Sequence, residues 1–194
     1  LAKDAVLIGS IVIADTLKDD AKSAIASLKA QNLHTVMLTG DSETTANAIA
    51  KETGIDEVYS RLLPDEKLAK LQEQRSKHGA VMFVGDGIND APALAAANVS
   101  VAMSDASDIA REAADITLRG ANLTELATLR KLSERLMKRI HSNYRFILGF
   151  NSTLLLLGLL SVLPPATSAF LHNASTMAIC AKSMTPLLKQ EDRK

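Results

Sequence analysis

The segment from Val81 to Leu94 constrains the fold of this chain more than any other part. Its first four residues, 81–84, are apolar and predict a buried strand, and Gly85 and Gly87 then allow the backbone to turn sharply at the carboxyl end of that strand. A helix is predicted to begin a few residues later. Ligands of open α/β sheets bind at the carboxyl ends of strands, and this turn holds three polar side chains there: Asp86, Asn89 and Asp90.

These three side chains are of the types that a hard cation prefers. Two carboxylates and an amide suit Mg²⁺, which takes oxygen ligands and often binds beside phosphate. We therefore predict that Asp86 and Asp90 bind Mg²⁺ and that Asn89 supports the site. The alternative is an ordinary Gly/Asp/Asn turn in which a polar side chain caps the following helix.

A second turn of a similar kind follows an earlier strand. Residues 35–38 are predicted to form a short buried strand, and Thr39, Gly40 and Asp41 follow it directly. The hydroxyl and the backbone N–H groups of this turn are able to hold phosphate oxygens. The alternative is that Asp41 or Ser42 only caps the next helix.

Strand and helix patterns alternate around these two turns. Short apolar runs predict strands at 5–14, 35–38, 58–59, 81–84, 99–102 and 116–118. Segments with one apolar face or clear capping signals predict helices at 19–29, 42–51, 65–77, 91–97 and 107–114. Pro64 and Gly79 mark the start and the end of the helix 65–77. This alternation predicts an α/β fold with a doubly wound, mostly parallel sheet and helices on both faces.

The two turns together resemble a known family. The run 85–94, Gly-Asp-Gly-Ile-Asn-Asp-Ala-Pro-Ala-Leu, resembles the hinge motif of the P-type ATPases, the ion pumps that pass through an aspartyl phosphate, and the run 37–41 resembles their second phosphate-site motif. The likeness extends over about 4–188 and is greatest for the heavy-metal branch. It implies a haloacid dehalogenase-like phosphorylation domain that uses Mg²⁺, and ATP in the complete pump. The phosphate site that it implies consists of Thr39, Gly40, Asp41 and Lys67.

Lys67 gains its role only through this resemblance. It lies near the start of a predicted helix, in the run Leu63-Pro64-Asp65-Glu66-Lys67. In P-type ATPases, a lysine that follows such a Pro-acidic-acidic run reaches a phosphoryl group, to which it brings a point charge. Without the resemblance, a lysine at this position would be read as a solvated surface residue.

Asp15 follows the first apolar run but does not fit a phosphatase nucleophile. Phosphatases of the haloacid dehalogenase superfamily carry Asp-x-Asp at that point, with the second Asp as acid/base, and here Leu17 stands in its place. The run 15–18 instead resembles a P-type element that ordinarily ends in Arg. Here it ends in Lys18, which cannot make the same bidentate contact.

Charge separates the two halves of the chain. Residues 1–130 carry 13 Lys and Arg against 19 Asp and Glu, whereas residues 131–194 carry 9 against 3. This asymmetry indicates two regions in different surroundings. The basic half is mostly apolar, which argues against a nucleic-acid surface. The single cysteine, Cys180, excludes an internal disulfide and fits a reducing compartment.

The basic half predicts a transmembrane helical hairpin. A helical pattern covers residues 123–142, and residues 146–181 contain no Asp, Glu, Lys or Arg. The run 146–163 approaches the ~20 residues that span a bilayer, and after Pro164-Pro165 the run 166–188 is long enough to return. Basic residues before the first span favour cytoplasmic ends by the positive-inside rule. The alternative is a hairpin buried in a globular protein.

These boundaries divide the chain into four parts. We predict the end of a phosphorylation domain at 1–122, a basic connecting helix at 123–145, two transmembrane helices at 146–188 and a cytoplasmic tail at 189–194. The chain is therefore expected to be an integral protein, with membrane lipid as a partner, in the cell membrane. Its soluble domain and both termini are expected in the cytoplasm.

The second predicted span carries the strongest candidate ligand for a transported metal. This candidate is His172, since imidazole binds borderline divalent metals. The run 172–176 resembles the last-span ion motif of some heavy-metal pumps. The residues that follow depart from that motif at Lys182 and Thr185. Oxygen and nitrogen donors in place of thiolates favour Zn²⁺, Mn²⁺ or another divalent ion over Cu⁺. The alternative role of the hydroxyl and amide groups is hydrogen bonding between helices. The predicted metal contacts are His172, Asn151, Ser175 and Thr176.

Three classes of function remain open. The first is the carboxyl-terminal part of a heavy-metal P-type ATPase, which couples ATP hydrolysis to metal transport. The sequence contains no Asp-Lys-Thr-Gly-Thr, the run with the phosphorylated aspartate, and no nucleotide-binding domain, so this chain alone is expected to be inactive without the missing part of the pump. The second is a haloacid dehalogenase-like phosphatase. The third is a non-catalytic membrane protein that regulates a partner pump.

Overall fold

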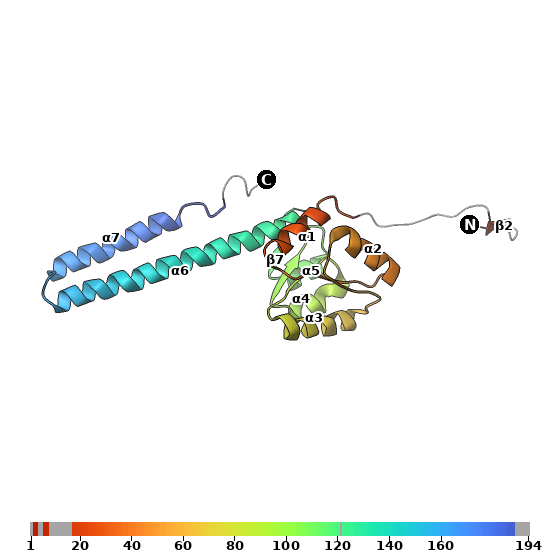
Figure 1. Cartoon of the computed structure of the whole chain (residues 1–194), viewed down its shortest axis with the longest axis horizontal. Coiled ribbons are helices and arrows are strands. Elements are labelled where there is room, and N and C mark those ends of the chain that lie inside the picture. Colours follow the sequence, from red (N-terminus) through yellow and green to blue (C-terminus); the bar gives the residue numbers. More distant parts are fainter. Residues whose placement is uncertain (1, 4–5, 8–16, 121, 189–194) are drawn as a thin grey trace. The chain divides into compact units, whose positions relative to one another are not determined.

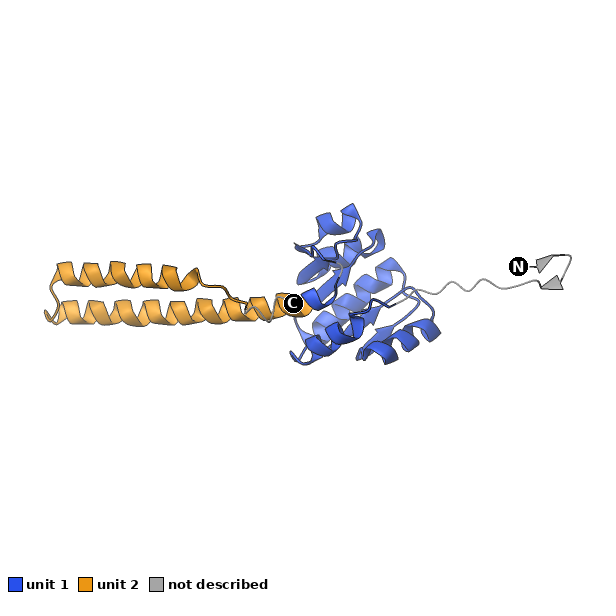
Figure 2. Ribbon diagram, turned by 90° about the horizontal axis from the view of Figure 1, so that it is seen from above, with its two compact units in different colours: residues 1–125 blue, residues 126–194 orange. Residues whose placement is uncertain are grey.

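A computed structural model of the 194-residue chain describes residues 2–3, 6–7, 17–120 and 122–188. It divides into two compact units, residues 1–125 and residues 126–194, which Figure 2 colours separately. The first unit is an α/β domain, and the second is a helical hairpin.

Parallel strands form the main sheet pieces of the first unit. β3 (Val36–Leu38) pairs in parallel with β4 (Glu57–Tyr59). A second, three-stranded piece consists, in spatial order, of β5 (Met82–Gly85), β6 (Val99–Ala102) and β7 (Ile116–Thr117), and its strands are also parallel. Helices lie between these strands along the chain (Figure 1), so the predicted α/β fold with a mostly parallel sheet is confirmed.

The strand predicted at 5–14 is described at only two of its residues. β1 (Ala2–Lys3) and β2 (Val6–Leu7) form a short antiparallel pair. The predicted strand therefore overlaps β2 by two residues. Its other residues all lie outside the described part of the chain, as do Asp15 and Thr16.

Helices of the first unit follow the start and stop signals of the sequence. They are α1 (Ala21–Lys29), α2 (Glu43–Thr53), α3 (Pro64–His78), α4 (Ala91–Ala96) and α5 (Asp108–Ala113). Ser42 caps α2, because its hydroxyl accepts a hydrogen bond from the N–H of Thr45 at 3.3 Å. Gly54 ends α2 with a φ of +81°, a left-handed conformation that glycine adopts without strain. Pro64 opens α3, where a missing N–H costs nothing.

At the amino-terminal ends of two pairs of parallel strands, an aspartate carboxylate accepts two hydrogen bonds from one residue of the other chain segment. Asp56 Oδ2 accepts hydrogen bonds from the N–H and the hydroxyl of Thr35, at 3.0 and 2.7 Å. Asp115 Oδ2 accepts from the N–H and the hydroxyl of Ser100 in the same way, at 2.9 and 2.8 Å. The Lys29 ammonium and the Thr35 donors lower the pKa of Asp56, and the Ser100 donors lower the pKa of Asp115. Charge-assisted hydrogen bonds thus fix the chain at β3–β4 and at β6–β7.

The core of the first unit is built largely from small side chains. One buried cluster of this core consists of Leu94, Ala102, Ala106 and Ala110, against which Phe83, Ala113 and Ala114 pack. Alanines let the helix backbones approach the sheet closely, so they hold α4 and α5 against β5 and β6. This packing also fixes the turn between β5 and α4, which contains the predicted Mg²⁺ ligands.

The second unit is an antiparallel pair of helices. α6 (Thr124–Leu159) is one continuous helix, and α7 (Pro165–Ser183) returns beside it (Figure 1). At the open end of the hairpin, Arg139 donates hydrogen bonds to the carbonyl oxygens of Ser183 and Thr185, at 3.2 and 2.6 Å. These bonds satisfy carbonyls that the end of α7 leaves without helical partners.

Both helices of the hairpin end before the predicted membrane spans do. α6 ends at Leu159, before the end of the predicted span 146–163, and α7 ends at Ser183, before the end of the predicted span 166–188. Among the helices of the described residues, none combines the length and the apolar character that a membrane crossing requires. The predicted transmembrane helices are therefore not confirmed by the fold.

Candidate functional site

Lys67 and Asp90 form an ion pair beside the turn that follows β5. Lys67 Nζ lies 2.9 Å from Asp90 Oδ1, and the two side chains are 16% and 13% exposed. Lys67 comes from the start of α3, and Asp90 ends the short 3₁₀ helix η1 (Ile88–Asp90). Breaking a largely buried ion pair is costly, because the remaining charge loses its partner. The structure thus brings together a predicted phosphate ligand and a predicted Mg²⁺ ligand.

Gly85 allows Asp90 to approach the end of β5. A Cβ atom on Gly85 would lie only 2.9 Å from the Cβ of Asp90 and 3.1 Å from a ring carbon of Phe83. Gly87 has a φ of −102° and a ψ of 161°, an extended conformation open to any residue, and a Cβ there would meet nothing closer than 3.8 Å. The turn therefore needs glycine at the first position for close packing and does not need it at the second.

Asp86 lies on the surface of the same turn, and its backbone is held in place. Its carbonyl oxygen accepts a hydrogen bond from the N–H of Ser107 at 2.8 Å. The hydroxyl of Ser107 in turn caps α5 by accepting from the N–H of Ala110 at 3.2 Å. The side chains of Asp86 and Asn89 are exposed, and in the described part of the chain no hydrogen bond or ion pair engages either of them. The turn thus offers an exposed carboxylate and an exposed amide beside the buried carboxylate of Asp90.

Thr39, Gly40 and Asp41 form a closed turn at the carboxyl end of β3. The hydroxyl of Thr39 donates to Asp41 Oδ2 at 2.7 Å and accepts from the N–H of Asp41 at 3.1 Å. The carbonyl oxygen of Thr39 accepts from the N–H of Leu62 at 3.0 Å. Because Leu62 leads directly into α3, this bond ties the turn to the helix that carries Lys67. Within the described residues, no direct hydrogen bond or ion pair joins the turn to the Lys67–Asp90 pair.

Lys18, the end of the run 15–18, contacts the loop before α5. Its Nζ lies 3.2 Å from Asp105 Oδ2, and this ion pair lowers the pKa of Asp105. Asp15 and Thr16 fall outside the described residues, so the role of the run stays a prediction.

The residues predicted to contact a transported metal share one pocket of the hairpin. The pocket has a volume of about 240 Å³ and is lined by Ile147, Asn151, His172, Ser175, Thr176, Ile179 and Cys180. His172 Nδ1 lies 3.0 Å from Asn151 Oδ1, which joins α7 to α6. The hydroxyls of Ser175 and Thr176 donate to the backbone carbonyl of His172, at 2.7 and 3.0 Å, and their oxygen lone pairs can still accept.

Comparison with known proteins identifies the family. Residues 2–98, half of the chain, match the model of a haloacid dehalogenase-like hydrolase. The copper-transporting P-type ATPase of Rhizobium leguminosarum bv. viciae is 44% identical over 149 residues, which cover 77% of this chain and 18% of that protein. The manganese-exporting P-type ATPase of Mycobacterium bovis is 40% identical over 195 residues, which cover 100% of this chain and 27% of that protein. The chain belongs to the haloacid dehalogenase-like hydrolases, in their heavy-metal P-type ATPase branch.

A solved P-type ATPase structure shares the fold. The crystal structure of a zinc-transporting PIB-type ATPase in the E2.Pi state matches with a TM-score of 0.84 and 34% identity, over 90% of this chain and 28% of that chain. Residues 126–194 make up more than a third of the present chain, so the match includes much of the hairpin. The chain spans at most 28% of the length of these P-type ATPases.

The sequence did not reveal two side-chain groupings of this P-type ATPase chain. One is the pairing of Lys67 with Asp90, and the other is a cluster of His34, Glu57 and His78. The partners come from separate elements, so no spacing pattern along the chain marks them. Topology alone could have predicted the Lys67–Asp90 pair. In a right-handed βαβ unit, the start of α3 lies at the same sheet edge as the carboxyl end of β5.

Proposed function

We propose that this chain is the carboxyl-terminal part of a heavy-metal P-type ATPase, a pump that couples ATP hydrolysis to the transport of a transition-metal cation across a membrane. The observation that carries this proposal is the Lys67–Asp90 ion pair beside the exposed carboxylate of Asp86 at the carboxyl end of β5. The 40% identity to a manganese exporter along the whole chain supports it. Phosphoryl transfer depends mainly on positioning and electrostatic stabilisation, which such an array of fixed charges supplies.

The turn after β3 and the start of α3 act on the phosphoryl group. The N–H of Gly40 would hold a phosphate oxygen. The Thr39 hydroxyl, which donates to Asp41 Oδ2 at 2.7 Å, would have to turn its proton from that carboxylate to a phosphate oxygen. Lys67 brings a positive charge toward the phosphoryl oxygens, and its ion pair with Asp90 fixes the ammonium group in place.

The turn after β5 fits Mg²⁺. Asp86 and Asn89 present exposed oxygen donors, which this hard cation prefers. One oxygen of Asp90 is bound to Lys67, so we assign Asp86 as the principal ligand and Asp90 as a second, supporting carboxylate. When bound, Mg²⁺ would neutralise charge on the transferring phosphoryl group.

The rest of the pump would supply the nucleotide site and the phosphorylated aspartate. The present sequence contains no Asp-Lys-Thr-Gly-Thr, and covalent catalysis requires that nucleophile. This chain alone is therefore expected not to hydrolyse ATP, although it carries phosphate and Mg²⁺ ligands.

The hairpin is proposed to lie in the membrane. Large apolar side chains stay exposed along it: Ile147, Leu148, Leu155, Leu156, Leu159, Leu160, Val162, Phe170 and Met177. An apolar surface of this extent marks contact with lipid or with other helices. The match to the zinc-transporting ATPase, which includes much of the hairpin, supports the same assignment. Basic residues of α6 before Phe146 would then lie at the cytoplasmic end.

The pocket around His172 is proposed to contact the transported metal. Its imidazole and the Asn151 amide face each other across the two helices. Apart from the thiol of Cys180, the donors that line the pocket are nitrogen and oxygen atoms, which favour a divalent ion such as Zn²⁺ or Mn²⁺ over Cu⁺. The relatives are named for copper, manganese and zinc, so the substrate class supported by them is a transition-metal cation.

Mg²⁺ binding to the full chain tests the proposed site. Titration of the detergent-solubilised chain with Mg²⁺ should shift the amide NMR signals of residues 85–90, and Asp86→Ala should abolish these shifts. Asp108→Ala is the matched control, because it removes a carboxylate that is 92% exposed at the start of α5. Shifts that survive Asp86→Ala, or that require Asp41 instead, would place the ion elsewhere.

A further inference from the structure

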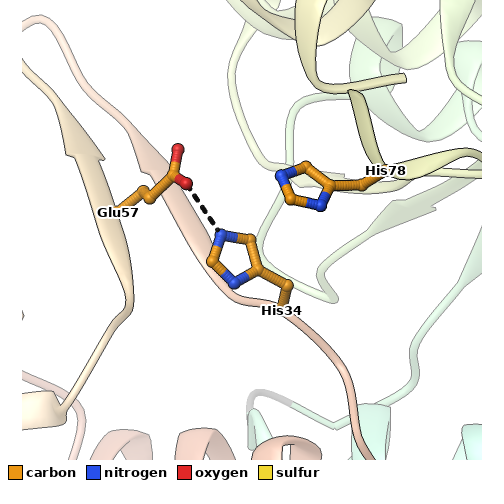
Figure 3. Close-up of side chains that lie close together, drawn as sticks. All are labelled: His34, Glu57 and His78. Carbon is orange, nitrogen blue, oxygen red and sulfur yellow. Dashed lines mark hydrogen bonds and ion pairs between the residues drawn. The ribbon is translucent and has the colours of Figure 1, made fainter. Parts of the chain in front are cut away.

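Three potential metal ligands converge on the first unit from three separate elements. His34 lies two residues before β3, Glu57 is the first residue of β4, and His78 is the last residue of α3. One ligand atom from each lies within 4.8 Å of the others. Figure 3 shows the hydrogen bond between His34 and the Glu57 carboxylate, with the imidazole ring of His78 beside them.

The contacts within this cluster already orient two of its members. His34 Nε2 lies 3.1 Å from Glu57 Oε1. The rings of His34 and His78 stack with their centroids 4.7 Å apart and their planes inclined by 25°. Because the two imidazoles are at the surface and Glu57 is half-buried, a cation from solution has access to the cluster.

The Glu57 carboxylate is oriented by hydrogen bonds to its second oxygen, as is common for carboxylates that bind a metal. Its Oε2 accepts hydrogen bonds from the Tyr59 hydroxyl at 3.0 Å and from Gln74 Nε2 at 3.1 Å. Outer partners of this kind orient ligating carboxylates. Lys77 Nζ lies 3.0 Å from Oε1, and this ion pair, with the Tyr59 and Gln74 donors, lowers the pKa of Glu57 to about 2. The carboxylate is therefore ionised at neutral pH.

The cluster lies at the opposite edge of the sheet from the predicted phosphate site. β3 and β4 run parallel, with Val36 opposite Glu57 and Leu38 opposite Tyr59. His34 and Glu57 are at the amino ends of these strands, whereas Thr39 follows the carboxyl end of β3. Any ion bound at the cluster is thus separate from the proposed Mg²⁺ and phosphate ligands.

We propose that His34, Glu57 and His78 form a binding site for a divalent transition metal, with Zn²⁺ as the ion that the ligand set suits best. Two imidazoles and one carboxylate make a three-ligand Zn²⁺ set, which leaves a fourth position for water. Ligand bonds of about 2.0–2.1 Å require the three groups to close in. His78 supplies this movement, because it is exposed and ends a helix. Lys77, whose side chain is 54% exposed, would give up its contact with Oε1.

The bound metal would connect the end of α3 to the amino ends of β3 and β4. It would therefore stabilise the first unit in a metal-dependent way, since a ligand that binds only the folded state raises its stability. This proposal rests on the cluster alone and does not depend on the pump function proposed above.

Zn²⁺ titration of the full chain in detergent tests the site. The chain has four histidines, so a background with His141→Asn and His172→Asn leaves only the two histidines that are proposed as ligands. In that background, the ring ¹⁵N signals of His34 and His78 should shift together at one Zn²⁺ per chain, and the melting temperature should rise. Shifts of only one ring, or of neither, would overturn the proposal.

Three variants in the same background separate the site from adventitious binding. His34→Asn and His78→Asn should each weaken Zn²⁺ binding by more than about tenfold, since loss of even an outer hydrogen-bond partner costs about 10- to 100-fold in metal affinity. Lys77→Met should strengthen binding, because it removes the cation that competes for Glu57 Oε1. Circular dichroism would establish that each variant is folded. Unchanged affinity in a folded His78→Asn variant would contradict the site.

Discussion

At the scale of the residue, the proposed phosphate and Mg²⁺ site depends on one close contact. Gly85 leaves room for Asp90, whose carboxylate in turn holds the ammonium group of Lys67 at 2.9 Å. The two charges stay largely buried together, so neither is free to reorient without leaving the other unpaired. A site preorganised in this way can stabilise charge on a phosphoryl group without first having to rearrange.

Replacing Gly85 with alanine should lower the free energy of unfolding by about 1–3 kcal/mol, the usual cost of forcing extra atoms into a packed site. The new methyl group would lie 2.9 Å from the Cβ of Asp90, which is attached directly to the backbone and cannot easily move. Gly87→Ala is the matched control and should be neutral or stabilising by up to about 1 kcal/mol, because alanine restricts the unfolded chain. Urea denaturation of both variants measures this, and equal losses would contradict the packing argument.

At the scale of the element, local sequence signals predicted much of the α/β unit. Pro64 and Gly79 bracket α3, and the strand predicted at 99–102 is β6. Such signals succeed because cap and turn residues act on the backbone next to them. The cluster of His34, Glu57 and His78 left no periodic trace in the sequence, because it depends on how α3 packs across the strands. For the Lys67–Asp90 pair the only signal was topological, namely the sheet edge that the start of α3 shares with the end of β5.

The hairpin shows why an uncharged run does not define a helix. The run 146–163 predicted one uninterrupted span, but α6 ends at Leu159 and Ser161 adopts a φ of +57°. The two prolines that follow explain part of this early end, since a residue before proline is disfavoured in the helical region. The absence of charged residues from a run therefore predicts neither where α6 ends nor which of its side chains face α7.

Thiol labelling in intact cells should report the proposed membrane crossing. In a Cys180→Ser background, Ala166→Cys at the start of α7 should react with a membrane-impermeant reagent added outside, whereas Ser142→Cys should not. The reason is the positive-inside rule: the basic residues of α6 favour the cytoplasmic side for the first part of this helix, which places the turn between α6 and α7 outside the cell. Labelling at Ser142→Cys alone would reverse the orientation, and labelling at neither position would contradict a hairpin that crosses.

At the scale of the whole molecule, the chain consists of an α/β unit with the proposed phosphate and Mg²⁺ ligands and a helical hairpin with an exposed apolar surface. Net charge follows the same division, since residues 131–194 hold 9 Lys and Arg against 3 Asp and Glu. The chain covers at most 28% of the length of the P-type ATPases that it matches. Its proposed activity therefore belongs to a longer protein in which both parts act together.

Metal transport by the complete reading frame that contains this chain tests that claim most directly. In inside-out membrane vesicles, uptake of Mn²⁺ or Zn²⁺ should require ATP and Mg²⁺, and this chain alone should show none. Asp86→Asn should reduce uptake by about 10² or more, on the scale of losing one electrostatic contact in a transition state, whereas Asp108→Asn should leave it unchanged. ATP-dependent uptake that persists in Asp86→Asn, or no ATP-dependent uptake of any transition metal, would contradict the account.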